Sequence, residues 1–155
     1  MRYVESPNCW SCLAASFAMI LNISFKQFCR ELGHDGSAIV HPGLRDPLCR
    51  RTFGIDECTL VAVRRGHSLT TLRFCPRITT DGVHMVDIPM DTEYLLRFPG
   101  VLCGMGKYNG SPCGHAVAWD GEIVLDPSIG RYPLGTNYFE PHTLYAVDIQ
   151  SQKTK

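Results

Sequence analysis

The most constraining feature of the 155-residue sequence is a run of apolar residues that begins directly after Cys12. Between Leu13 and Leu21 only Ser16 is polar, so a helix over this stretch would have almost no polar face. A helix that is apolar on all sides must be buried, because it has no surface to present to water. We therefore predict a central helix over Cys12–Leu21 that the rest of the chain covers.

Two further helices are predicted after this run. Ser24 and Gln27 have the spacing of a capping box, and Gly33 is suited to end the helix that they begin. A third helix is predicted over Asp56–Arg65, with Asp56 as its cap. Segment 36–51 contains two prolines and is predicted to be an irregular loop.

The second half of the chain has the pattern of strands joined by turns. Helices followed by strands indicate an α+β fold, with helices packed on a mainly antiparallel sheet. The length suits one domain over residues 1–155, and the sequence contains no repeat or linker. The predicted strands are Ser68–Phe74, Val83–Ile88, Gly100–Met105, Gly114–Trp119, Glu122–Asp126 and Thr143–Ile149, with a short helical turn at Thr92–Phe98.

Composition argues against several functional classes. The chain has 15 basic and 15 acidic residues, so bulk charge does not favour nucleic acid or anionic lipid as a partner. No apolar run reaches the roughly 18 residues of a membrane span, and the N-terminus does not have the pattern of a signal peptide. We therefore expect a cytoplasmic protein, whose eight cysteines serve as buried thiols, metal ligands or nucleophiles rather than disulfides.

A histidine and an aspartate are expected to meet in a hairpin. The dipeptide Asp120-Gly121 lies between two β-patterned runs and predicts a two-residue type I′ turn. That turn would place His115 directly opposite Asp126, with Cβ atoms about 4.5–5.5 Å apart and Nδ1 within reach of the carboxylate. A carboxylate that orients a histidine is typical of nucleophilic catalysis. The alternative is a polar pair on an exposed sheet face, but the apolar neighbours of His115 favour the functional interpretation.

Cys12 is the candidate nucleophile for this pair. It lies in the first turn of the predicted buried helix, where unpaired N–H groups and the helix dipole stabilise a thiolate. Cys12, His115 and Asp126 then follow in the order nucleophile, general base and orienting carboxylate.

The same segments resemble a known family. Trp10–Phe25 resembles the active-site helix of small papain-fold cysteine peptidases, both the bacteriophage-encoded kind and the bacteriocin-transporter leader peptidases. Glu31–Ser37 is similar to the following segment of the phage group, while Gly114–Gly121 and Leu125–Pro127 resemble the strands that carry the histidine and the aspartate. The resemblance implies a papain-like fold and a thiol hydrolase that acts on peptide or protein substrates without a cofactor.

The chain also departs from the family pattern. Ser11 replaces the usual aspartate before the nucleophile, and Ser6 stands where the family places an oxyanion-hole glutamine. The nearest side-chain amide, Asn8, is therefore the candidate oxyanion donor. Trp10 and Trp119 are candidates to line the cleft, with ordinary core packing as the alternative.

Other interpretations use the same cysteines. Cys9 and Cys12 form a Cys-x-x-Cys motif, and Cys113 with His115 could complete a zinc site in which Asp126 is only an outer partner. Cys9 could also be the nucleophile in place of Cys12. A thioredoxin-like redox role is disfavoured because no strand is predicted before the motif. We predict no bound metal.

Two further functions remain open on the same fold. The Cys–His–Asp triad could transfer an acyl group to an amine instead of water, if water is excluded. The chain could also be a non-catalytic binding module that acts through its loops.

Overall fold

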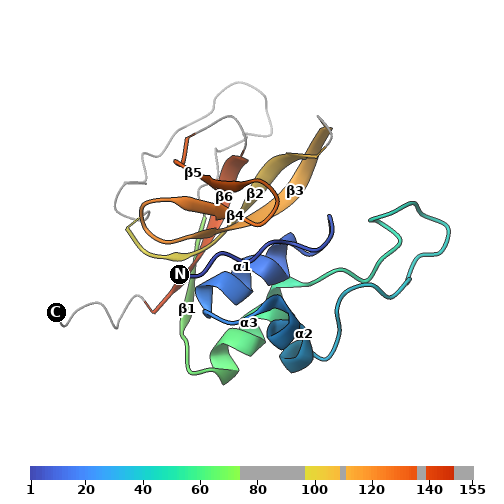
Figure 1. The fold of residues 1–155 in the computed structure, drawn as a ribbon, viewed down its shortest axis with the longest axis horizontal. Helices are drawn as coiled ribbons and strands as arrows, with labels where there is room; N and C mark the ends of the chain where they lie inside the picture. The colour runs from blue at the N-terminus through green and yellow to red at the C-terminus, as the bar shows by residue number, and fades with distance from the viewer. Residues whose placement is uncertain (74–96, 109–110, 136–138, 149–155) are drawn as a thin grey trace, which may run out of the picture.

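The computed structural model describes residues 1–73, 97–108, 111–135 and 139–148 (Figure 1). Three helices lie against a six-stranded antiparallel sheet, which confirms the α+β class. The predicted strand Val83–Ile88 and most of the predicted turn Thr92–Phe98 lie outside the described residues.

The central helix α1 spans Cys12–Ile20 and is buried as predicted. Its only polar side chain after the first residue, Ser16, is fully buried and donates a hydrogen bond of 3.1 Å to the carbonyl of Ala116. Because this bond satisfies the hydroxyl, a polar residue is tolerated inside an otherwise apolar helix. The fully buried apolar residues of α1 are Ala14, Ala15, Phe17, Ala18 and Met19.

Helix α2, Phe25–Leu32, begins and ends where the sequence predicts. Ser24 Oγ accepts a hydrogen bond of 3.1 Å from the N–H of Gln27, and Gly33 adopts the left-handed conformation with φ of 90°. This is only one of the two hydrogen bonds of a capping box. The Gln27 side chain donates to Glu31 instead of bonding back to Ser24.

Helix α3, Ile55–Arg64, begins one residue earlier than predicted. Glu57 Oε1 accepts a hydrogen bond of 2.7 Å from the N–H of Gly54, so Gly54 rather than Asp56 occupies the N-cap position. The predicted loop between α2 and α3 is irregular as expected, and backbone hydrogen bonds from Thr52 to Gly36 close its base.

The sheet has the strand order β1-β6-β2-β3-β4-β5, and each pair of neighbours is antiparallel. The short strand β5 was not predicted, because three residues are too few to show an alternating pattern. The strands are β1 Leu69–Arg73, β2 Gly100–Tyr108, β3 Ser111–Trp119, β4 Val124–Asp126, β5 Gly130–Tyr132 and β6 Phe139–Val147.

Alternation along β3 sets the position of the helices. Ala116 and Ala118 pack with α1 residues, whereas Val117 and Trp119 belong to a second apolar cluster. Small alanines on the helix side let α1 lie close to the strand. The second cluster consists of Leu102, Val117, Trp119, Val124, Tyr132, Phe139, Leu144 and Ala146.

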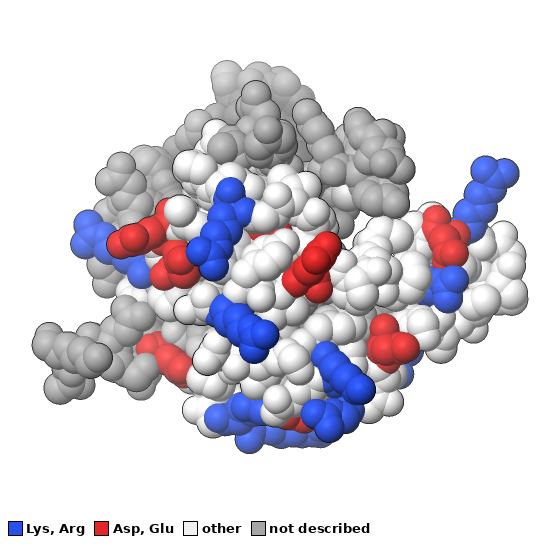
Figure 2. All heavy atoms as spheres, in the orientation of Figure 1, with Lys and Arg blue, Asp and Glu red and all other residues white. Residues whose placement is uncertain are grey.

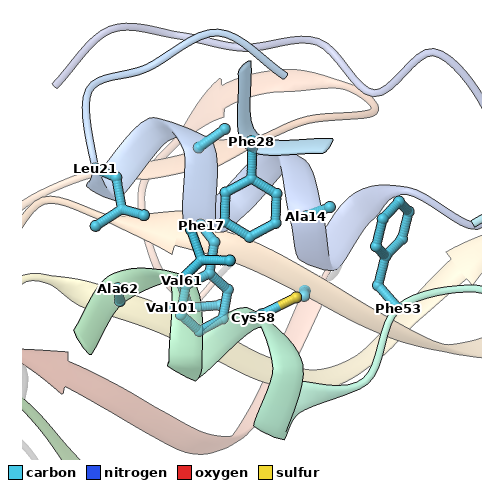
Figure 3. Packing of buried hydrophobic residues seen from close by; sticks show 11 residues of the cluster. Ala14, Phe17, Leu21, Phe28, Phe53, Cys58, Val61, Ala62 and Val101 are labelled. Carbon is cyan, nitrogen blue, oxygen red and sulfur yellow. The ribbon is translucent and has the colours of Figure 1, made fainter. Parts of the chain in front are cut away.

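The three helices share an apolar cluster that also includes Val101 of β2 and Ala116 of β3 (Figure 3). The rings of Phe17 from α1 and Phe28 from α2 lie 6.2 Å apart and gather with Cys58 and Val61 of α3. All four side chains are at most 1 % exposed, so this cluster packs α1 against α2 and α3.

The face shown in Figure 2 carries both acidic and basic side chains. Among the described residues, no single helix is long and apolar enough to cross a membrane.

Replacing Phe17 tests the role of this core. Phe17→Ala should lower the free energy of unfolding by about 3–5 kcal/mol, because it removes a fully buried ring and leaves a cavity. Leu60→Ala on α3 is the control, since Leu60 is 52 % exposed. Urea denaturation measures both variants, and equal losses would contradict the assignment of Phe17 to the core.

Candidate active site

The hairpin between β3 and β4 differs from the prediction. Trp119 pairs with Val124, so four residues rather than two connect the strands. Asp120 favours this wider turn, because its Oδ1 accepts hydrogen bonds from the N–H groups of Glu122 at 2.9 Å and Ile123 at 2.7 Å. The predicted two-residue turn is therefore wrong.

The wider turn shifts the pairing by two residues and leaves His115 and Asp126 on one face. If the register continued, Asp126 would oppose Val117 rather than His115. Side chains alternate with a period of two, so an even shift keeps the pair on the same face as diagonal neighbours. His115 Nε2 donates a hydrogen bond of 2.9 Å to Asp126 Oδ2, which confirms the pairing but corrects the predicted nitrogen, Nδ1.

The carboxylate of Asp126 is buried and fully engaged. The residue is 2 % exposed, and its carboxylate accepts hydrogen bonds from His115, from Tyr132 Oη at 2.8 Å and from the N–H of Ser128 at 2.8 Å. Burial acts to raise the pKa of Asp126, but the charge and hydrogen bond of His115, aided by Ser128 and Tyr132, outweigh it and lower the pKa. Asp126 is therefore an ionised acceptor.

Residues of β2 and β6 pack against the imidazole of His115. A Cβ atom on Gly106 of β2 would lie only 2.8 Å from His115 Cβ, so the histidine packs directly over the glycine. Phe139 of β6 meets the imidazole edge-on, with ring centroids 6.0 Å apart. The ring is thus restrained from two sides in addition to its bond to Asp126.

The environment of His115 favours the imidazolium. Burial acts to lower the pKa of His115, but hydrogen bonds with Asp126 and Cys12 and the charges of both partners raise it to about 9. The histidine is consequently a cation at neutral pH.

Cys12 lies beside this imidazole. It is the first residue of α1 and is half-buried, and its proximity to the imidazole helps to raise the pKa of His115. Because Nε2 bonds to Asp126, Nδ1 is the ring nitrogen left for the sulfur. The structure thus brings together the three residues that the sequence proposed for the triad.

Asn8 shapes the turn that leads into α1. Its Oδ1 accepts hydrogen bonds from the N–H of Trp10 at 3.2 Å and from Ser11 Oγ at 2.5 Å. Ser11 occupies the N-cap position but donates to Asn8 rather than capping the helix. The Nδ2 amide of Asn8 is the group that can still donate to an oxyanion.

The two tryptophans occupy different environments. Trp10 is partly buried two residues before Cys12, and the guanidinium of Arg50 lies 4.6 Å from its ring centroid. Trp119 is 4 % exposed within the second apolar cluster, so it is a core residue rather than a cleft wall. The correction follows from the alternation of β3, which directs Trp119 into that cluster.

The remaining thiols differ from Cys12. All seven cysteines among the described residues are free, and within that part of the chain no group of three or more metal-binding side chains is placed to hold an ion. The arrangement therefore gives no support to a zinc site of Cys9, Cys12, Cys113 and His115.

Burial, or for Cys49 the bond to Asp46, raises the thiol pKa of Cys29, Cys49, Cys58, Cys103 and Cys113.

Sequence reasoning missed three residues of this site, namely Gly106, Tyr132 and Phe139. Each contacts His115 or Asp126 from another strand. No local motif marks them, because their role depends on strand pairing.

Comparison of the chain with family models, with curated proteins and with solved structures gives no match.

The protonation of His115 can be measured by NMR titration of labelled histidine. The imidazole should titrate at about 9, and its pKa should fall in Cys12→Ala and in Asp126→Asn, because each variant removes a group that favours the imidazolium. Signals of histidines remote from the site should not move. An unchanged titration in both variants would contradict this network.

The packing of His115 on Gly106 gives a second test. Gly106→Ala should displace the imidazole and change its NMR signal, since the added Cβ has no room. Gly114→Ala is the matched control, because nothing lies within 4 Å of a Cβ built there. Equal spectra for both variants would show that Gly106 does not position the ring.

Proposed function

We propose that the protein is a papain-like thiol hydrolase of peptide or isopeptide bonds, with Cys12 as nucleophile, His115 as general base and acid, and Asp126 as the orienting carboxylate. The observation that carries the proposal is the hydrogen bond of 2.9 Å between His115 and a buried Asp126, with Cys12 beside the imidazole at the N-terminus of a buried helix. An N-terminal helix packed on an antiparallel sheet is compatible with the papain-like architecture. Free thiols are compatible with a cytoplasmic location.

The first chemical step uses the Cys12–His115 pair. The imidazolium and the helix N-terminus both favour the thiolate, which attacks the carbonyl carbon of the substrate. The resulting oxyanion would lie near the N–H of Cys12, which has no partner within the helix, and the Asn8 amide is the proposed second donor.

His115 then completes both halves of the reaction. Its Nδ1 proton passes to the leaving amine as the C–N bond breaks, and an acyl-thioenzyme on Cys12 remains. Neutral His115 next takes a proton from water, whose oxygen attacks the thioester. The C–S bond breaks, and the carboxylic acid leaves while Cys12 returns to the thiolate beside the His115 imidazolium. Asp126 keeps the ring oriented throughout. It accepts the hydrogen bond from Nε2–H and does not itself become protonated.

Selective labelling tests the nucleophile. In brief treatment with iodoacetamide at about pH 6, Cys12 should react first, because ordinary thiols are mostly protonated there. His115→Ala should slow the reaction at Cys12 by about tenfold or more, and Asp126→Asn by less, since it disturbs only the orientation of the ring. Peptide mapping by mass spectrometry identifies the labelled cysteine.

Cys9→Ser and Cys12→Ala are the matched pair for this experiment. Cys9 is the exposed thiol three residues before Cys12, so its loss should leave the labelling unchanged. Cys12→Ala should fold normally and abolish both labelling and hydrolysis of peptide substrates. If Cys9 or Cys113 reacts first while Cys12 stays inert, the assigned nucleophile is wrong.

A further inference from the structure

We propose that Tyr132 is a positioning residue of this site, which holds Asp126 in the orientation that supports His115. The inference rests on the proposed function, and it assigns a fourth side chain to the Cys12 network. Its basis is the buried hydrogen bond of 2.8 Å from Tyr132 Oη to Asp126 Oδ2.

The geometry around Asp126 gives this bond a specific task. Tyr132 and His115 donate to the same oxygen, Oδ2, at 2.8 Å and 2.9 Å, while the N–H of Ser128 donates to Oδ1 at 2.8 Å. With Oδ2 held from two directions, the carboxylate cannot rotate away from the imidazole without breaking a bond to the tyrosine. The hydroxyl also helps to compensate for the loss of water around a carboxylate that is 2 % exposed.

Tyr132 is itself held rigidly. It lies on β5 opposite Val124 of β4, and the register pairs Asp126 with Gly130 on the same two strands. Its side chain belongs to the second apolar cluster and the residue is 8 % exposed. Burial and the charge of Asp126 raise the pKa of Tyr132, so the phenol stays protonated and can only donate to the carboxylate.

A neighbouring tyrosine provides a matched comparison. Tyr3 Oη donates a hydrogen bond of 3.1 Å to the backbone carbonyl of Asp126. Tyr3→Phe therefore removes a hydroxyl that contacts the same residue but not its carboxylate. If the carboxylate matters, only Tyr132→Phe should affect Cys12 and His115.

The test is a double-mutant cycle on the rate at which iodoacetamide alkylates Cys12. Tyr132→Phe should slow alkylation by about threefold to tenfold. This range corresponds to losing part of the free energy of one hydrogen bond to a charged group. The pKa of His115 should fall in Tyr132→Phe, because a carboxylate that can rotate supports the imidazolium less well. In an Asp126→Asn background the same substitution should have no further effect, since Tyr132 acts through the carboxylate.

Several results would overturn the inference. One is an equal slowing of Cys12 alkylation by Tyr132→Phe in the wild-type and Asp126→Asn backgrounds, and another is an equal slowing by Tyr3→Phe. A third is a loss of thermal stability by Tyr132→Phe while the pKa of His115 stays unchanged. NMR titration of His115 separates this inference from the proposed function. If Cys12 is inert in the wild type, the hydrolase proposal fails. The positioning role then stands only if Tyr132→Phe still lowers the pKa of His115 when Asp126 is present and not when it is Asn.

Discussion

The burial of α1 against β3 is the constraint on which the candidate site depends. Ala116 and Ala118 leave room for the helix, and the hydrogen bond from Ser16 to the carbonyl of Ala116 fixes its position along the strand. Cys12 begins this helix and His115 directly precedes Ala116, so one packing contact determines the separation of sulfur and imidazole. The apolar cluster around Phe17 also packs the same helix against α2 and α3.

The second constraint is a charge placed where water cannot reach it. A buried carboxylate is unfavourable unless donors surround it, and Asp126 has a histidine, a tyrosine and a backbone N–H. Strands β3 and β5 and the segment after β4 provide these groups. This part of the sheet thus stabilises the charge of the Asp126 carboxylate, and the carboxylate in turn favours the imidazolium of His115.

Environment rather than residue type distinguishes the cysteines. Burial raises the pKa of Cys103 to about 12, and it also keeps the Cys58 thiol protonated within the helical core. Cys12 differs because it combines the N-terminus of a helix with an imidazolium partner. Among the described cysteines, Cys12 is thus the thiol that lies beside the His115–Asp126 pair.

The sequence by itself determined the local features: the buried helix after Cys12, the caps at Ser24 and Gly33, and the shared face of His115 and Asp126. These follow from apolar periodicity and from the alternation of strands, which neighbouring residues alone encode. It did not determine the length of the turn at Asp120, because a side-chain hydrogen bond competed with the preferred dipeptide turn. Only the tertiary structure decided that Nε2 rather than Nδ1 meets Asp126, that Trp119 belongs to the core, and that Gly106, Phe139 and Tyr132 surround the pair. Those contacts join strands that are distant along the chain, and their register depends on packing that no local pattern records.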